Sequence, residues 1–271
     1  MTNATPDGSA HLRRAARDDS LAKPIGPRRY AARPSGRPVL VCAGDSITHG
    51  AISARWVSRV ASSTASAMDT VNAGGNGNLA WNLLSRLDEI IACRPSVVTA
   101  LIGTNDALAQ ISDAWTDGYM KGQHLPQRPT AQWYEDNLQR IVERLQSETS
   151  AAVALMSLPP LGDAVKGRWH DLIAPYNAII RDVAARAAVP VLPVHEYVTD
   201  LIGQRPPVPW DGTKKLMGRA VVRRFVLRRS WDAIARSHGF STTTDAVHLN
   251  ERAGARIAAL VEQFARDAVR S

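Results

Sequence analysis

The sequence contains very little cysteine and no long apolar run. Only Cys42 and Cys93 occur among 271 residues, too few for the disulfide framework of a small secreted domain. No stretch approaches the roughly 20 consecutive apolar residues of a membrane-spanning helix, and the opening residues lack the apolar block of an export signal. The seven histidines are scattered, so no metal site is indicated. These absences predict a cytoplasmic protein that needs no cofactor.

The composition is that of an ordinary globular protein with an uneven distribution of positive charge. Hydrophobic residues make up 45% of the chain and charged residues 21%, with a net charge of +8. Residues 1–37 hold eight Lys and Arg against three acids, and residues 205–236 hold nine against two. We expect residues 1–37 to form a disordered or loosely attached basic arm, and residues 38–271 to form one domain with a basic insertion at about 205–244.

From Pro38 onward, short apolar runs alternate with segments of helical period. The predicted strands are Val39–Ala43, Thr70–Ala73, Ser96–Ile102, Ala151–Ser157 and Pro190–Val194. This alternation predicts an α/β fold, a three-layer α/β/α sandwich of the flavodoxin-like kind with a five-stranded, mostly parallel sheet. Right-handed crossovers then place the loops that follow the strands at one edge of the sheet, where binding sites form.

Two segments carry side chains suited to nucleophilic chemistry. Ser46 lies in Gly44-Asp45-Ser46, directly after the first predicted strand, although a serine in this place is more often a helix cap or turn residue. Asp245 precedes His248 by three residues, just before the last predicted helix. Asp245 could therefore accept from His248 Nδ1 and leave Nε2 facing a nucleophile, whereas the simpler interpretation is a capping or solvated pair.

Two further strand ends offer hydrogen-bond donors for a developing negative charge. The second predicted strand is followed by the glycine-rich run from Asn72 to Asn78, whose glycines permit close approach of a backbone N–H. The third is followed by Gly103-Thr104-Asn105-Asp106, in which the Asn105 amide is a donor. Taken separately, each of these segments is an ordinary turn.

Taken together and in this order, the four segments resemble the conserved blocks of the SGNH (GDSL-like) hydrolase family. Gly44-Asp45-Ser46 is similar to the first block, Gly77 to the glycine of the second, Gly103-x-Asn105-Asp106 to the third and Asp245-x-x-His248 to the fifth. The second-block glycine is counted from Asn72, and Gly74 and Gly75 are the alternatives. The resemblance covers nearly all of the chain beyond the basic arm.

This resemblance implies an ester hydrolase with Ser46 as nucleophile, His248 as general base and then acid, and Asp245 as the carboxylate that orients His248. It implies an oxyanion hole made of the Ser46 and Gly77 backbone N–H groups and the Asn105 amide. Ile47 replaces the leucine of the GDSL motif, a change that keeps an apolar side chain. The Gly-x-Ser-x-Gly elbow is absent around Ser46, which argues against the α/β-hydrolase fold.

The substrate class is less sharply indicated. Trp115, Tyr119 and Met120 lie in the irregular segment 107–130, and either wall an apolar substrate pocket or pack the segment onto the domain. The basic insertion is interpreted as a lid or as a helix packed on two sides. Contact with an anionic surface is an alternative, although on one continuous helix its apolar residues fall on opposite sides.

Our hypothesis is a serine esterase or lipase that cleaves small-molecule or lipid acyl esters through an acyl-enzyme. Thioester hydrolysis, O-deacetylation of a carbohydrate and acyl transfer would use the same residues. A hypothesis of another class is a binding module that holds nucleic acid or an acidic partner through the basic segments. The Asp245 and His248 pair argues against that module, since a binder needs no base, so no specific nucleic acid is expected; the oligomeric state is left open.

Overall fold

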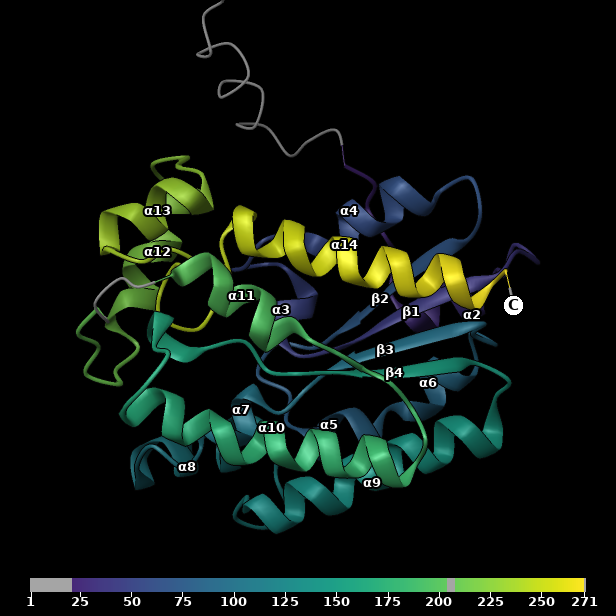
Figure 1. Ribbon diagram of the computed structural model, residues 1–271, viewed down its shortest axis with the longest axis horizontal. Helices are drawn as coiled ribbons and strands as arrows, with labels where there is room; N and C mark the ends of the chain where they lie inside the picture. Colours follow the sequence, from purple (N-terminus) through teal and green to yellow (C-terminus); the bar gives the residue numbers. More distant parts are fainter. Residues whose placement is uncertain (1–20, 204–207, 271) are drawn as a thin grey trace, which may run out of the picture.

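The strands form where runs of apolar, often β-branched residues can be covered by helices on both sides. The computed structural model describes residues 21–203 and 208–270. Its strands are β1 Val39–Gly44, β2 Asp69–Gly74, β3 Val97–Leu101, β4 Ala152–Met156 and β5 Val191–Leu192. They lie in the order β2-β1-β3-β4-β5, and every neighbouring pair is parallel. The predicted α/β sandwich with a five-stranded sheet is therefore confirmed (Figure 1).

The fifth strand is shorter than the predicted Pro190–Val194. Only Val191 and Leu192 pair with β4, and Val194 already begins helix α11. Proline residues flank the pair at 190 and 193, and proline has no backbone N–H to donate to a neighbouring strand.

Helices cover both faces of the sheet (Figure 1). Helices α4 and α14 pack against each other on one face, with α11 against α14, whereas α9 packs against α5 and α10 on the other. The described helices, including the short 3-10 helix η3, are α2 Pro27–Ala31, α3 Ser46–His49, α4 Trp56–Thr64, α5 Ala80–Ser85, α6 Leu87–Ile91, α7 Thr104–Leu108, α8 Asp113–Gly122, α9 Ala131–Glu148, η3 Leu161–Asp163, α10 Arg168–Arg186, α11 Val194–Ile202, α12 Lys215–Phe225, α13 Trp231–His238 and α14 Glu251–Ala268. None of these helices is both long and apolar enough to cross a membrane.

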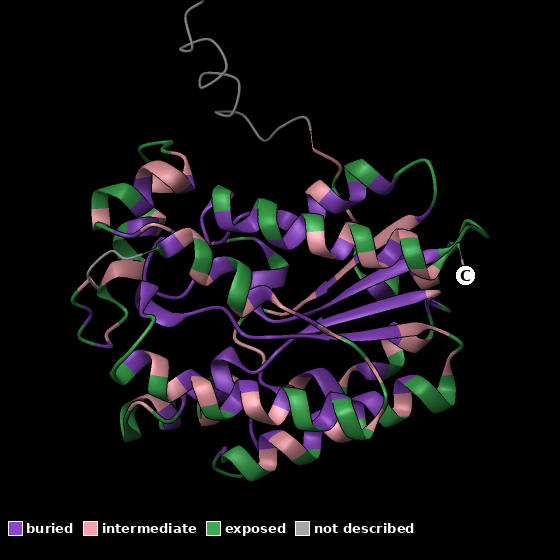
Figure 2. Ribbon diagram, viewed as in Figure 1, coloured by how far each residue is buried: buried purple, intermediate pink, exposed green. Residues whose placement is uncertain are grey.

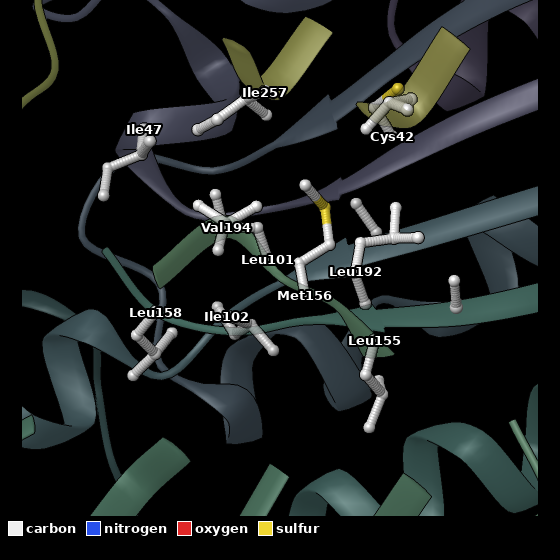
Figure 3. Close-up of a cluster of buried hydrophobic side chains, with 14 of the residues drawn as sticks. Cys42, Ile47, Leu101, Ile102, Leu155, Met156, Leu158, Leu192, Val194 and Ile257 are labelled. Carbon is white, nitrogen blue, oxygen red and sulfur yellow. The ribbon is translucent and has the colours of Figure 1, made fainter. Parts of the chain in front are cut away.

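The core lies on both sides of the sheet. Every residue of β1 and β3 is buried, as Figure 2 shows by their uniform colour, because a parallel sheet enclosed by helices has no solvent face. Side chains alternate along each strand. Leu155 and Met156 accordingly point to opposite sides of β4 in Figure 3, where Met156 lies toward Val194. This rigid layer holds the strand ends in place.

The prediction of a disordered arm does not hold for residues 21–37. Helix α2 packs near the edge strand β2, and Tyr30 is buried with its hydroxyl donating to Asp69 Oδ2 at 3.1 Å. The Ile25 carbonyl accepts from Asn72 N at 3.1 Å and so satisfies a donor of the β2 edge. Apolar side chains and an open strand edge therefore order this basic segment; residues 1–20 lie outside the described residues.

The basic insertion forms helices α12 and α13, which lie together at the left of Figure 1. Trp231 and Ile234 of α13 form a small cluster with Ala220 of α12. Glu251, at the start of α14, accepts from the Trp231 and Asp232 backbone N–H groups at 2.8 and 2.5 Å, which fixes α13 against the domain. Residues 204–207, with Arg205, lie outside the described residues.

Candidate active site

The predicted site residues follow three adjacent strands at the point where the sheet order reverses. From β1 the chain passes outward to the edge strand β2, then returns across β1 to β3. Ser46, Gly77 and Asn105 follow β1, β2 and β3 respectively. Open α/β sheets form their crevice outside the carboxyl ends of strands at such a reversal, so the topology brings these three residues to one place.

Ser46 is held at the first turn of α3, directly after β1. Gly44 ends the strand with φ 158°, and a Cβ there would collide with the Leu101 carbonyl of the neighbouring strand. Asp45 caps α3 by accepting from Ile47 N at 2.9 Å. Strand, glycine and cap together place the Ser46 side chain at the sheet edge.

Ser46, His248 and Asp245 form one chain of hydrogen bonds. Ser46 Oγ lies 2.9 Å from His248 Nε2, and His248 Nδ1 lies 2.8 Å from Asp245 Oδ2. The other Asp245 oxygen accepts from the backbone N–H of Val247 at 3.1 Å and of His248 at 2.8 Å. All three residues are buried, so the carboxylate orients the imidazole with little competition from water.

Asp245 and His248 each favour the charged form of the other. Burial alone would lower the pKa of His248, but the nearby charge of Asp245, its hydrogen bond and the charge of Asp45 outweigh burial and raise that pKa above its usual value. Burial likewise opposes ionisation of Asp245, yet the His248 charge and the hydrogen bonds to His248 and Val247 lower the Asp245 pKa. Asp245 is therefore ionised at neutral pH and stabilises a protonated His248.

The residues of the predicted oxyanion hole, Ser46, Gly77 and Asn105, all line one cavity. Within the described part of the chain, the backbone amides of Ser46 and Gly77 make no hydrogen bond, and Gly77 has φ 72°, a conformation that favours glycine. Asn105 Nδ2 donates one hydrogen to the Asn78 carbonyl at 2.9 Å, which leaves its second hydrogen free. The Tyr119 hydroxyl donates to Asn105 Oδ1 at 2.6 Å and so fixes which way the amide is turned.

Two buried carboxyl groups support the strand ends. Asp106 accepts from the first N–H of α5, at Ala80, with Oδ2 at 3.1 Å, and burial raises the pKa of Asp106 to about 7. Burial also raises the pKa of Asp45 to about 6, although its bond to Ile47 N and the charge of His248 oppose the rise. Each group ties one strand end to the helix that must sit beside it.

A cavity of about 340 Å³ opens above these groups. Ser46, Gly77, Asn105 and His248 are among the residues that line it. Helix α8 and the insertion supply further walls, through Trp115, Tyr119, Lys214 and Met217. This volume falls in the usual range of small-molecule sites.

Helix α8 explains which of the aromatic and apolar candidates reach the cavity. Trp115 and Tyr119 are four residues apart on one helix face and both line the cavity. Met120 is not among its lining residues, since the next position along a helix is turned by about 100°. The segment predicted to be irregular is thus a helix that presents one face to the site.

Arg86 is a structural contributor that sequence reasoning missed. Its Nη2 donates to the carbonyls of Gly44 at 3.2 Å and Ala73 at 2.7 Å, and its Nε donates to Asn78 Oδ1 at 2.9 Å. The guanidinium therefore joins the ends of β1 and β2 to the turn before α5. Arg86 directly follows the helical apolar pattern of Leu79, Leu83 and Leu84. An arginine at the end of such a pattern was the one sequence feature that could have indicated this structural role.

Among the described residues no group of three or more His, Cys, Asp or Glu is placed to hold a metal ion. What the site does offer is a hydroxyl, a base and several N–H donors around one cavity. This set is suited to attack on a carbonyl group.

Solved structures share this fold. The model resembles Axe2, an acetylxylan esterase from Geobacillus stearothermophilus, with a TM-score of 0.59 and 18% identity over 86% of this chain and 94% of the other. It resembles the lipase/acylhydrolase from Enterococcus faecalis with a TM-score of 0.56 and 20% identity, over 85% and 96%. The acetyl xylan esterase AlAXEase gives 0.57 and 17%, over 83% and 98%. At these identities the likeness concerns the fold.

Comparison of the sequence with family models identifies the family as well as the fold. No curated protein resembles the chain closely enough to count as a match. The model of the GDSL-like Lipase/Acylhydrolase family, however, matches residues 42–256, a range that includes Ser46, Gly77, Asn105, Asp245 and His248. The chain therefore belongs to the GDSL-like lipase/acylhydrolase family of ester hydrolases.

Proposed function

We propose that the protein is a serine hydrolase that cleaves carboxylic acyl esters through an acyl-enzyme on Ser46. The observation that carries this proposal is the series of hydrogen bonds from Ser46 Oγ through His248 to Asp245, in which Ser46 and His248 line a cavity. A serine with no base beside it is a weak nucleophile, and an adjacent imidazole oriented by a carboxylate activates it.

In the proposed mechanism His248 Nε2 takes the Ser46 proton while Oγ attacks the ester carbonyl carbon. The carbonyl oxygen becomes negative and is stabilised by the Ser46 and Gly77 N–H groups and by Asn105 Nδ2. As the C–O bond to the alcohol breaks, His248 returns the proton to the leaving oxygen. A water molecule, deprotonated by His248, then attacks the acyl-enzyme and releases the acid.

We further propose a short acyl group as the first substrate to examine. The cavity is small, and two of the solved structures with this fold are named acetylxylan esterases. A thioester would form the same acyl-enzyme as an ester. The group that then attacks the acyl-enzyme distinguishes the two activities: water makes the protein a hydrolase, and an alcohol makes it a transferase.

The test is hydrolysis of p-nitrophenyl esters of increasing acyl length, combined with labelling by a fluorophosphonate. We expect turnover and covalent labelling in the native chain, and loss of both in Ser46→Ala. Ser58→Ala is the matched control because Ser58 is also buried but lies in α4, outside the cavity. A native protein that is folded but shows neither activity nor labelling would overturn the proposal.

A further inference from the structure

An exposed apolar patch lies at the end of α12. Val222, Phe225, Val226 and Leu227 are 52%, 59%, 71% and 59% exposed; we name these four residues the α12 tip. The other large hydrophobic residues exposed in the described part of the chain, Val165, Tyr197 and Val269, are far apart in the sequence. Single exposed apolar side chains are ordinary, whereas a contiguous group marks a contact surface.

The tip exists because the helix breaks where the sequence suggested continuity. On one continuous helix, Val222 and Phe225 would lie opposite Trp231 and Ile234, so no apolar face would emerge. In the structure α12 ends at Phe225 and α13 begins at Trp231, with Arg228 at φ 51° in the turn between them. Trp231 and Ile234 are buried in the domain. The break thus leaves one apolar set buried and the other exposed, and the two meet where the Phe225 and Trp231 rings pack edge-on with their centroids 6.3 Å apart.

Four arginines surround the α12 tip, at positions 223, 224, 228 and 229. Arg223 donates to Ser237 Oγ at 2.5 Å, and Arg224 donates to the Arg229 carbonyl at 3.1 Å and lies over the Trp231 ring at 5.2 Å. None of the four forms an ion pair with a carboxylate among the residues that the structure describes. The tip therefore carries uncompensated positive charge directly beside exposed apolar side chains.

We propose that the α12 tip docks the protein on an anionic lipid bilayer, with the apolar side chains in the interface and the arginines on lipid phosphates. Apolar insertion combined with basic flanks is the chemistry of peripheral membrane attachment. A second copy of the chain fits less well, because a two-fold contact at the tip would bring arginines against arginines. Nucleic acid would bind the arginines and stack a base on Phe225, but it offers no apolar environment for the three exposed aliphatic side chains Val222, Val226 and Leu227.

The α12 tip and the wall of the cavity lie at opposite ends of one helix. Met217, in the first turn of the same helix, lines the cavity, and Lys214 directly before the helix does so as well. Docking one end of α12 therefore brings the cavity wall near the lipid surface. The binding step itself does not depend on the proposed hydrolysis.

The experiment is sedimentation of the Ser46→Ala chain with vesicles of phosphatidylglycerol and phosphatidylcholine, and with vesicles of phosphatidylcholine alone. Ser46→Ala prevents any turnover of lipid during the measurement. We expect binding to the anionic vesicles and a weakening of about tenfold or more when Val226→Asp and Leu227→Asp are added. Tyr197→Asp with Val269→Asp, which places the same two charges on other exposed apolar residues, is the control and should bind unchanged.

A second pair of variants tests the charges. Arg228→Ala with Arg229→Ala should weaken binding to anionic vesicles by about thirtyfold, whereas Arg181→Ala on the exposed side of α10 should not. Thermal melting confirms that each variant is folded. No binding to either vesicle would overturn the proposal. Binding that is lost with the arginines but unchanged by Val226→Asp and Leu227→Asp would also overturn it, because the arginines would then adsorb to lipid phosphates without any insertion of the apolar side chains.

Discussion

The Tyr119 hydroxyl donates a 2.6 Å hydrogen bond to Asn105 Oδ1, and both residues line the cavity together with Ser46. Two contacts distinguish the oxygen end of the amide from its nitrogen end: the Tyr119 hydroxyl donates to Oδ1, and Nδ2 donates to the Asn78 carbonyl. The tyrosine contributes one of these two orienting bonds to a side chain that lines the cavity. Tyr119 is therefore a positioning residue for a proposed oxyanion donor.

Tyr119→Phe should lower kcat for p-nitrophenyl acetate by about tenfold, because Asn105 loses one orienting bond of ordinary strength. Asn105→Ala should cost about 100- to 1,000-fold, as expected for removal of an oxyanion donor. In the double variant, the tyrosine change should add little. Steady-state kinetics of the three variants check this relation. Equal effects of Tyr119→Phe in the presence and absence of the Asn105 amide would contradict it.

The rate should depend on pH through His248. A general base must be neutral, so kcat/KM should rise with pH as His248 loses its proton, with a midpoint above the usual histidine pKa of about 6.5. Asp245→Asn removes the charge that most strongly raises the His248 pKa, so the rise should move to lower pH. Its kcat should also fall by about 10⁴-fold because the imidazole loses its orientation. A pH profile of Asp245→Asn with an unshifted midpoint would argue against this electrostatic pairing.

Lys214 should favour substrates that carry negative charge. Its Nζ lies 4.6 Å from the Trp115 ring centroid, and no carboxylate lines the cavity in the described part of the chain. Lys214→Met should raise KM for the acetate ester of 4-hydroxybenzoate by about tenfold and leave phenyl acetate unchanged. Lys215→Met is the matched control, since Lys215 lies 4.0 Å from Asp211 and outside this cavity. Equal changes in KM for both esters would show that Lys214 does not discriminate between charged and neutral substrates.

Asp106 should make the protein less stable as pH rises. Burial raises its folded-state pKa to about 7, above the ordinary value of 3.8, so the folded chain holds this proton more tightly than the unfolded chain does. The resulting stability is complete below about pH 4 and lost by about pH 7. Asp106→Asn keeps an oxygen for Ala80 N and cannot ionise, so it should lose less stability across this range.

Thermal denaturation at several pH values tests the Asp106 prediction. The melting temperature of Asp106→Asn should exceed that of the native chain by a few degrees at pH 8, with the gap narrowing at pH 4. Asp182→Asn, on the exposed side of α10, should leave the pH dependence as it is. Parallel curves for Asp106→Asn and the native chain would refute the assignment.

The sequence by itself determined the sheet and the order in which chemical groups reach its edge. Apolar runs such as Val39–Ala43 predict buried strands from local composition, and parallel strands must deliver the residues that follow them to one side. That reasoning placed Ser46, the glycine-rich run after the second strand and Asn105 at one edge, and the spacing paired Asp245 with His248. Gly77 within that run came from the resemblance to the SGNH family. Neither inference needed knowledge of side-chain contacts.

Only the tertiary structure decided the features that depend on contacts between distant segments. Tyr119 meets Asn105, and Arg86 meets Gly44, because separate helices pack on the same strand ends. Tyr30 holds a basic segment against the domain, because the free energy gained by burying its side chain against β2 exceeds the cost of ordering the polar residues 21–37. Likewise, the helix breaks after Phe225 because Trp231 and Ile234 bury themselves elsewhere, and this packing leaves the α12 tip exposed.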